Sequence, residues 1–113
     1  MTHILVKKSN DMILAFEIDG HTGYGVEGED ILCAGLSCIA QTACLGLLMV
    51  AHAEVQILRD EERGYLKCSL PDDLPKDVMH DCQVILNTAL LGFNDLKEGY
   101  SDFIELEVEE YVY

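Results

Sequence analysis

A histidine and a cysteine, His21 and Cys33, are the residues of this chain whose types and spacing best suit covalent chemistry. His21 follows an apparent strand, and Cys33 lies near the start of an uncharged helical segment. A helix macrodipole and a nearby imidazolium both favour a thiolate over a thiol at such a position. The pair therefore predicts a cysteine nucleophile that attacks a peptide carbonyl, with His21 taking the thiol proton and later protonating the leaving amine.

Two further residues of the same stretch have predicted supporting roles. Asp30 is a suitable N-cap, which would put Cys33 at the third helical position, and Ser37 lies one turn beyond Cys33 on the same face. Backbone amides at the helix start could stabilise the oxyanion. Acidic residues around Asp30 oppose a second negative charge, so the thiolate would depend on the dipole and on charged His21. Asp30 could also orient His21, although a carboxylate that caps a helix has less capacity for that role.

The segment between the two residues contains the pattern G-x-G-x-x-G, formed by Gly23, Gly25 and Gly28. This pattern alone is a weak sign of a dinucleotide site. Acidic residues crowd the helix start, where a pyrophosphate would meet like charges, and the order of elements does not suggest a parallel βαβ unit. We predict instead a flexible loop that passes close to a bound chain or closes over a cleft.

The length of 113 residues predicts a single domain, residues 1–113. The formal net charge is -14, from 21 acidic and 7 basic residues. Such a surface disfavours direct nucleic-acid binding, because cations must replace the counterions around phosphate. It favours a basic partner or substrate, which a negative surface attracts. The other interpretation, that the acidity only keeps the protein soluble, stays open.

The cysteines number five, which is odd, and the N-terminus has no signal-peptide pattern. We therefore expect reduced thiols and a cytoplasmic protein. The cysteines lack zinc-ligand spacing, so we expect no metal site and no cofactor. A cysteine in an apolar segment is most often an inert core residue. We expect this inert role for Cys38, Cys44, Cys68 and Cys82. For Cys33, spacing alone does not decide between an inert core residue and a catalytic one.

Residues 31–53 carry no formal charge and are long enough to span a bilayer. Polar residues interrupt the segment, among them Ser37, Gln41 and His52, and no lysine or arginine flanks it closely, as an oriented span would usually need. We therefore predict no membrane contact. The segment is better interpreted as the central core helix of a soluble domain.

Hydrophobic periodicity predicts strands and helices in a simple order. A first hairpin joins strands 2–6 and 12–19 through residues 9–11, and a helix follows over 30–50. A second hairpin joins strands 54–59 and 64–70 through residues 60–63. A second helix covers 76–91, where Gly92 ends or weakens it, and a last strand covers 103–109. The order ββαββαβ predicts an α+β fold with two helices packed on a mostly antiparallel sheet.

The same stretch resembles the motif of the bacterial ribosomal-processing cysteine protease family, called Prp. It reads Gly20-His21, followed by Gly28-Glu29-Asp30-Ile31-Leu32-Cys33-Ala34-Gly35-Leu36-Ser37. The family pattern is a Gly-His pair, a glycine-bearing loop and then Asp-Ile-Val-Cys-Ala-Ala-Val-Ser. The resemblance covers nearly the whole chain, since length and element order also agree. The departures, at Thr22, Leu32, Gly35 and Leu36, are mild and leave the Cys–His dyad in place.

The resemblance implies a homodimeric α+β protease. It implies removal of a short N-terminal extension from a large-subunit ribosomal protein, number twenty-seven of that subunit. His21 and Cys33 would be the catalytic pair, and Asp30 and Ser37 match motif positions that support the site. Such a substrate is basic, which agrees with the acidic chain. The glycine loop would become ordered when the extension binds, which would protect other peptides from cleavage.

Two other function classes stay open at this point. A non-enzymatic acidic binding module would hold a basic ribosomal partner, and a Cys33→Ser change would leave its salt-dependent binding intact. A thiol redox sensor would oxidise Cys33 reversibly. It lacks an obvious resolving cysteine, because Cys38 lies on a different helix face and Cys44 lies about three turns away.

Overall fold

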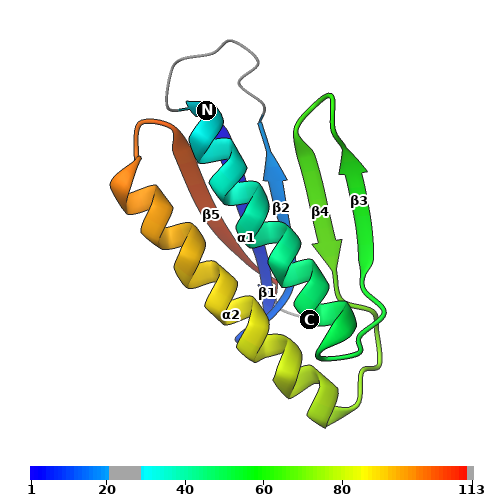
Figure 1. Cartoon of the computed structure of the whole chain (residues 1–113). Helices are drawn as coiled ribbons and strands as arrows, with labels where there is room; N and C mark the ends of the chain where they lie inside the picture. The colour runs from blue at the N-terminus through cyan, green and yellow to red at the C-terminus, as the bar shows by residue number, and fades with distance from the viewer. Residues whose placement is uncertain (21–28, 112–113) are drawn as a thin grey trace.

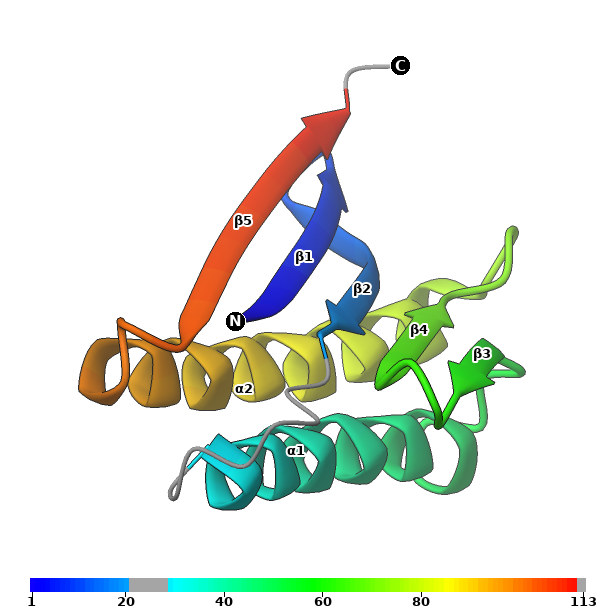
Figure 2. The same ribbon diagram turned by 90° about the horizontal axis from the view of Figure 1, so that it is seen from above.

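The protein has two layers, a five-stranded sheet and a pair of helices that cover one of its faces (Figures 1 and 2). The computed structural model describes residues 1–20 and 29–111, apart from the side chains of residues 29 and 30. The elements in chain order are β1 (Thr2–Ser9), β2 (Met12–Asp19), α1 (Glu29–Met49), β3 (Gln56–Asp60), β4 (Tyr65–Ser69), α2 (Lys76–Gly99) and β5 (Ile104–Tyr111). This order confirms the predicted ββαββαβ arrangement and the α+β class.

The strands lie in the order β3-β4-β2-β1-β5, so the two ends of the chain pair beside each other in the sheet. Strand β1 pairs antiparallel with β2 and parallel with β5, and the β2–β4 and β3–β4 pairs are antiparallel. The sheet is therefore mixed and mostly antiparallel, as predicted. Strand β1 runs to Ser9, further than expected, because the turn needs only Asn10 and Asp11, which adopt positive φ angles of 52° and 63°.

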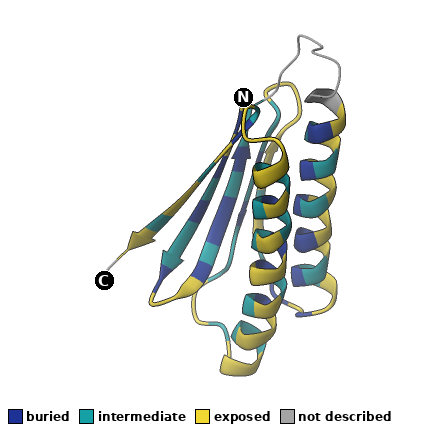
Figure 3. Ribbon diagram, turned by 90° about the vertical axis from the view of Figure 1, so that its left-hand side faces the viewer, coloured by how far each residue is buried: buried dark blue, intermediate teal, exposed yellow. Residues whose placement is uncertain are grey.

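The core lies between the sheet and the helices. Alternate residues of β1 and β2 face the helices and are buried, among them Ile4, Val6 and Phe16 (Figure 3). The Phe16 ring packs against Phe93 of α2 with ring centroids 5.8 Å apart. One stripe of α1, including Leu36, completes this apolar cluster. The stripe fixes the rotation of α1 about its axis, and therefore where Cys33 points.

Helix α2 does not end near Gly92, contrary to the sequence prediction, but continues to Gly99. Phe93 is buried and Leu96 packs against the core, so the apolar stripe goes on past the glycine. A Cβ atom at Gly92 would lie 3.3 Å from the Cδ1 atom of Ile39 in α1. Gly92 therefore serves the close approach of the two helices, a tertiary role that its local propensity does not reveal.

Helix α1 is described from Glu29 onward, and residues 21–28 directly before it lie outside the described part of the chain. The predicted N-cap role of Asp30, with Cys33 at the third helical position, therefore stays a prediction. Cys33 lies in the N-terminal part of α1, which is the end of a helix that favours negative charge.

Helix α1 is buried on one face only, so the expectation of a central core helix is wrong for its outer side. Leu36 and Leu47 are buried against the sheet, whereas Ile31, Leu45 and Met49 are exposed (Figure 3). The reason is architectural, since no third layer among the described residues covers the helices. Residues 31–49 are long and apolar enough to cross a membrane by length and composition alone, and one third of that window is buried inside the protein.

Candidate active site

Cys33 lies at the edge of a cavity of about 280 Å³ between the N-terminal half of α1 and the β3–β4 hairpin. The thiol is half-buried, since the residue is neither enclosed in the core nor fully exposed. Ser37 and Gln41 follow it along α1 and line the same cavity. The structure therefore brings Cys33 and Ser37 together on one wall, as their helical spacing predicts.

The other predicted site residues lie outside what the structure describes. His21 and the glycines Gly23, Gly25 and Gly28 fall in residues 21–28, and only the backbone of Asp30 is described. The pairing of His21 with Cys33 therefore stays a prediction. What the structure does place is Gly20, the residue directly before His21, which also lines the cavity with Cys33.

Thr2 is a residue of this site that sequence reasoning missed. Its side chain is buried, with an exposed fraction of 3% for the residue. Its Oγ1 atom lies 3.3 Å from the carbonyl oxygen of Gly20, to which it donates a hydrogen bond, and 3.8 Å from the Sγ atom of Cys33. The strand alternation that puts Ile4 and Val6 against the helices would have placed Thr2 on the same side.

Gly20 closes the gap between the ends of β1 and β2. Its φ angle is +133°, which L side chains rarely adopt. A Cβ atom there would lie 2.5 Å from the carbonyl oxygen of Met1 and 2.9 Å from the Cα atom of Thr2. Only glycine allows this backbone approach, which sets Thr2 between the chain that leads to His21 and the helix that carries Cys33.

The opposite wall of the cavity comes from the β3–β4 hairpin. Arg59 pairs in register with Leu66, whose side chain faces the helices, so Arg59 projects to the same side of the sheet as Cys33. Asp60 and Glu61 line the cavity beside it. Asp60 pairs with Tyr65, so its carboxylate points to the open face of the sheet, where it accepts a hydrogen bond from the Arg63 N–H group.

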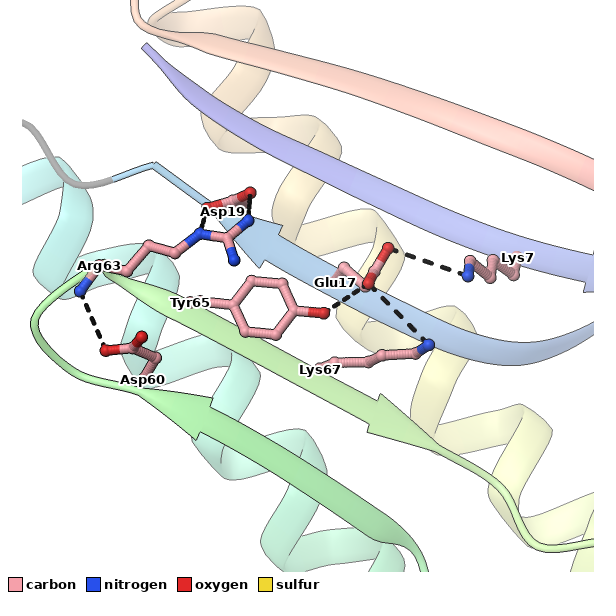
Figure 4. Close-up of polar contacts among 7 residues, drawn as sticks. All are labelled: Lys7, Glu17, Asp19, Asp60, Arg63, Tyr65 and Lys67. Carbon is pink, nitrogen blue, oxygen red and sulfur yellow. Dashed lines mark hydrogen bonds and ion pairs between the residues drawn. The ribbon is translucent and has the colours of Figure 1, made fainter.

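A polar network on the open face of the sheet fastens this hairpin to β2 (Figure 4). The guanidinium of Arg63 donates from Nε and Nη2 to the two carboxylate oxygens of Asp19, over 3.1 Å and 2.5 Å. It also lies over the ring of Tyr65, 4.7 Å from the centroid. Asp19 directly precedes Gly20, so the network joins the hairpin wall to the strand end that leads to His21.

Tyr65 extends the network deeper along β2. Its hydroxyl donates a 2.6 Å hydrogen bond to Oε1 of Glu17, and Lys7 and Lys67 each lie 4.0 Å from the same carboxylate. The hydrogen bond to Glu17, followed by desolvation, raises the pKa of Tyr65 to about 12. The phenol therefore stays protonated as a donor at neutral pH and holds β4 against β2.

The remaining cysteines divide into two groups. Cys44, Cys68 and Cys82 are buried, as expected of inert core thiols. A hydrogen bond with the Cys44 thiol and then burial raise the pKa of Cys68, and burial raises that of Cys82. Cys38 is exposed, so the expectation that it is a core residue is wrong. It lies on the outer side of α1, which no other described element covers.

Metal-binding geometry is not found within residues 1–20 and 29–111. No three of the histidine, cysteine, aspartate and glutamate side chains described there come close enough together to hold a metal ion. The residues that line the cavity with Cys33 carry hydroxyl, amide and guanidinium groups, which suit the binding of a peptide.

Comparison with known proteins identifies the class to which this fold and site belong. A sequence model of the family described as Cysteine protease Prp matches residues 1–105. The chain therefore belongs to the Prp family and is a cysteine protease.

Two relatives support the assignment over most of the chain. The chain is 24% identical over 103 residues to the ribosomal processing cysteine protease Prp of Bacillus subtilis, covering 90% of this chain and 92% of the relative. It is 27% identical over 99 residues to the protein of the same name from Staphylococcus aureus strain Mu50, covering 88% of this chain and 86% of the relative.

Solved structures show the same fold. The crystal structure of SMU.848 from Streptococcus mutans matches with a TM-score of 0.88 and 25% identity, covering 98% of this chain and 96% of that one. The structure of an essential ribosomal processing protease Prp from S. aureus, in complex with a substrate peptide, matches with a TM-score of 0.84 and 23% identity. It covers 96% of this chain and all of that chain.

Proposed function

We propose that this protein is a site-specific endopeptidase that removes the N-terminal extension of a large-subunit ribosomal protein, number twenty-seven of that subunit. The observation that carries the proposal is the position of Cys33, half-buried at the edge of a cavity of about 280 Å³, in a chain of the Prp family. The related S. aureus protease was solved with a substrate peptide, which supports a peptide as the occupant.

In this mechanism the Cys33 thiolate attacks the scissile carbonyl carbon and forms a thioester, while His21 takes the thiol proton and returns it to the leaving amine. Water then attacks the thioester, giving its proton to His21, and the carboxylate product leaves as the thiol re-forms. Backbone amides at the start of α1 would stabilise the oxyanion. Asp30 and Ser37 would support the pair, and Ser37 lines the cavity beside Cys33.

The charge of the protein supports a basic substrate. The chain carries a net charge of -14, and two acidic residues, Asp60 and Glu61, are among those that line the cavity. A negative surface raises the encounter rate with a cationic chain by roughly 10- to 1,000-fold at low salt.

A cytoplasmic homodimer completes the proposal. The outer side of the helix layer exposes Ile31, Leu45 and Met49 of α1 and Leu91 of α2. Residues 31–53 carry no formal charge, so two strongly acidic copies could meet there with little repulsion. Analytical ultracentrifugation of the protein and of Leu45→Glu tests this part, and a wild-type monomer at micromolar concentration would contradict it.

The test of the activity is cleavage of the ribosomal protein from the same organism, with a version that lacks the extension as the control substrate. Mass spectrometry of the product gives the new N-terminus. We expect cleavage by the wild type only of the extended form, and none by Cys33→Ala or His21→Ala. Tight, salt-dependent binding without cleavage by the wild type would favour the acidic binding module, and cleavage by Cys33→Ala would refute the proposal.

A further inference from the structure

Thr2 occupies the narrow space between the strand end that leads to His21 and the helix that carries Cys33. Its Oγ1 atom lies within reach of two atoms, the Gly20 carbonyl oxygen at 3.3 Å and the Cys33 sulfur at 3.8 Å. We propose that the Thr2 hydroxyl is a third catalytic group of this site, which donates a hydrogen bond to the Cys33 thiolate. This inference rests on the proposed role of Cys33 as the nucleophile.

The proton count of the hydroxyl gives the mechanism. Thr2 has one O–H proton and two acceptor lone pairs, and the Gly20 carbonyl can only accept. While Cys33 is a thiol, the hydroxyl donates to Gly20 and its oxygen accepts the S–H proton. Once Cys33 has lost its proton to the general base, its sulfur can only accept. The Thr2 proton then turns from Gly20 to the thiolate, without any net gain or loss of protons at Thr2.

The energetic balance favours this exchange. A hydrogen bond to an ionised acceptor is roughly twice as strong as one between neutral groups. The bond that is given up, to Gly20, is long at 3.3 Å. Thr2 is 3% exposed, so water has little access to its hydroxyl and does not compete with the thiolate for its proton. The hydroxyl therefore stabilises the charged form of Cys33 more than the neutral form.

The backbone holds the hydroxyl in place. The Thr2 N–H group donates a 2.8 Å hydrogen bond to the carbonyl oxygen of Phe103, which fixes the first residue of β1 beside β5. On the other side Gly20 packs directly against the Thr2 Cα atom. Thr2 is one of two buried polar residues among those described, and the other, Ser9, lies at the far end of β1.

The experiment replaces Thr2 by valine, which keeps the branched shape and removes the hydroxyl, and by serine, which keeps the hydroxyl. Ser9→Ala is the matched control, since it removes a buried hydroxyl from the same strand. The readout is the alkylation rate of Cys33 by iodoacetamide as a function of pH, followed by peptide mass spectrometry. The exposed Cys38 thiol on the same helix serves as an internal reference in each sample.

We expect Thr2→Val to slow Cys33 alkylation at neutral pH by about three- to tenfold and to move its pH profile upward. Thr2→Ser and Ser9→Ala stay within about twofold of the wild type, and Cys38 alkylation does not change. In the cleavage assay kcat falls while KM is nearly constant. Wild-type alkylation of Cys33 in Thr2→Val, or an equal slowing at Cys38, would overturn the inference, and so would a failure of serine to restore the rate.

The test separates this inference from the proposed function, because alkylation needs no substrate. If Thr2→Val slows alkylation but the wild-type protein cleaves no ribosomal protein, the proposed function fails and the role of Thr2 stands. If cleavage depends on Cys33 but Thr2→Val has the wild-type alkylation rate, only the role of Thr2 fails. Should Thr2→Val not fold by circular dichroism, the pair Thr2→Ser and Thr2→Ala isolates the same hydroxyl oxygen.

Discussion

Two thiols on the same helix, those of Cys33 and Cys44, lie in opposite environments. Cys33 is half-buried at a cavity lined by a hydroxyl, an amide and charged side chains, whereas Cys44 is buried in the apolar core against Cys68. Both residues come from one uncharged segment and have the same chemistry in isolation. The comparison teaches that the rotation of α1 and the elements opposite each thiol decide which one can react.

The largest expected effect is that replacing one thiol removes activity and replacing the other lowers stability. Cys33→Ser should slow cleavage by at least about a thousandfold and leave the thermal unfolding of the protein nearly unchanged, because it removes the proposed nucleophile from a half-buried position. Cys44→Ser should cost about 1 to 3 kcal/mol of unfolding free energy, because it buries a hydroxyl in the core, and should leave kcat nearly unchanged. Cleavage rates and urea unfolding measure both, and loss of activity in Cys44→Ser without unfolding would break the comparison.

The next largest effect belongs to the backbone at the site. Gly20→Ala should cost about 2 to 3 kcal/mol of unfolding free energy, because the new Cβ would lie 2.5 Å from the Met1 carbonyl oxygen at a φ of +133°. It should also slow Cys33 alkylation, since Thr2 and the strand end must move apart. Gly99→Ala is the control, because nothing lies within 4 Å of a Cβ there. Equal stabilities for the two variants would contradict the close approach at Gly20.

A smaller effect is expected from the network that fastens the hairpin wall. Arg63→Ala removes both hydrogen bonds to Asp19 and frees the turn beside the cavity. If the hairpin wall binds substrate, as the proposed function implies, KM for cleavage should rise by about threefold with little change in kcat. Lys97→Ala, which removes a surface cation from α2, is the control for charge alone. A change in kcat with constant KM would show that the network acts on the nucleophile.

The smallest effect is a pH dependence of the unfolding free energy, which comes from the Tyr65–Glu17 hydrogen bond. Hydrogen bonding to Glu17 raises the pKa of Tyr65 from 10.0 to about 12, so the folded state holds the phenol proton more tightly than the unfolded chain. The stability from this bond is present below pH 10 and is lost as the pH rises toward 12. The difference in unfolding free energy between the wild type and Tyr65→Phe should therefore become smaller as the pH rises from 10 to about 12. Thermal melting at several alkaline pH values measures this, and a constant difference would contradict it.

The order of elements could be predicted from the sequence, because alternation in the strands and helical periodicity are local patterns. The exceptions are tertiary. Gly92 does not end α2, since its role is to admit Ile39 of the neighbouring helix. Cys38 is exposed because no third layer covers the helices within residues 1–20 and 29–111, and the uncharged segment around it gives no sign of this.

The candidate site shows the same division. The positions of Cys33 and Ser37 on one face of α1 follow from helical spacing, and the structure brings both to the cavity. Thr2 could not be found this way, because it precedes β2 in the sequence and Cys33 follows it, so their contact forms only in the folded protein. The hairpin wall with Arg59 and Glu61 likewise depends on how β4 pairs with β2.

The most direct test of the account is to trap the nucleophile with a peptide that carries the cleavage-site residues and a chloromethyl ketone at the scissile position. Mass spectrometry of the digested protein then identifies which of the five cysteines carries the adduct. We predict a single thioether at Cys33, formed slowly in His21→Ala and blocked by excess uncleaved substrate. An adduct at another cysteine that abolishes cleavage, or complete alkylation of Cys33 with cleavage unimpaired, would contradict the central claim.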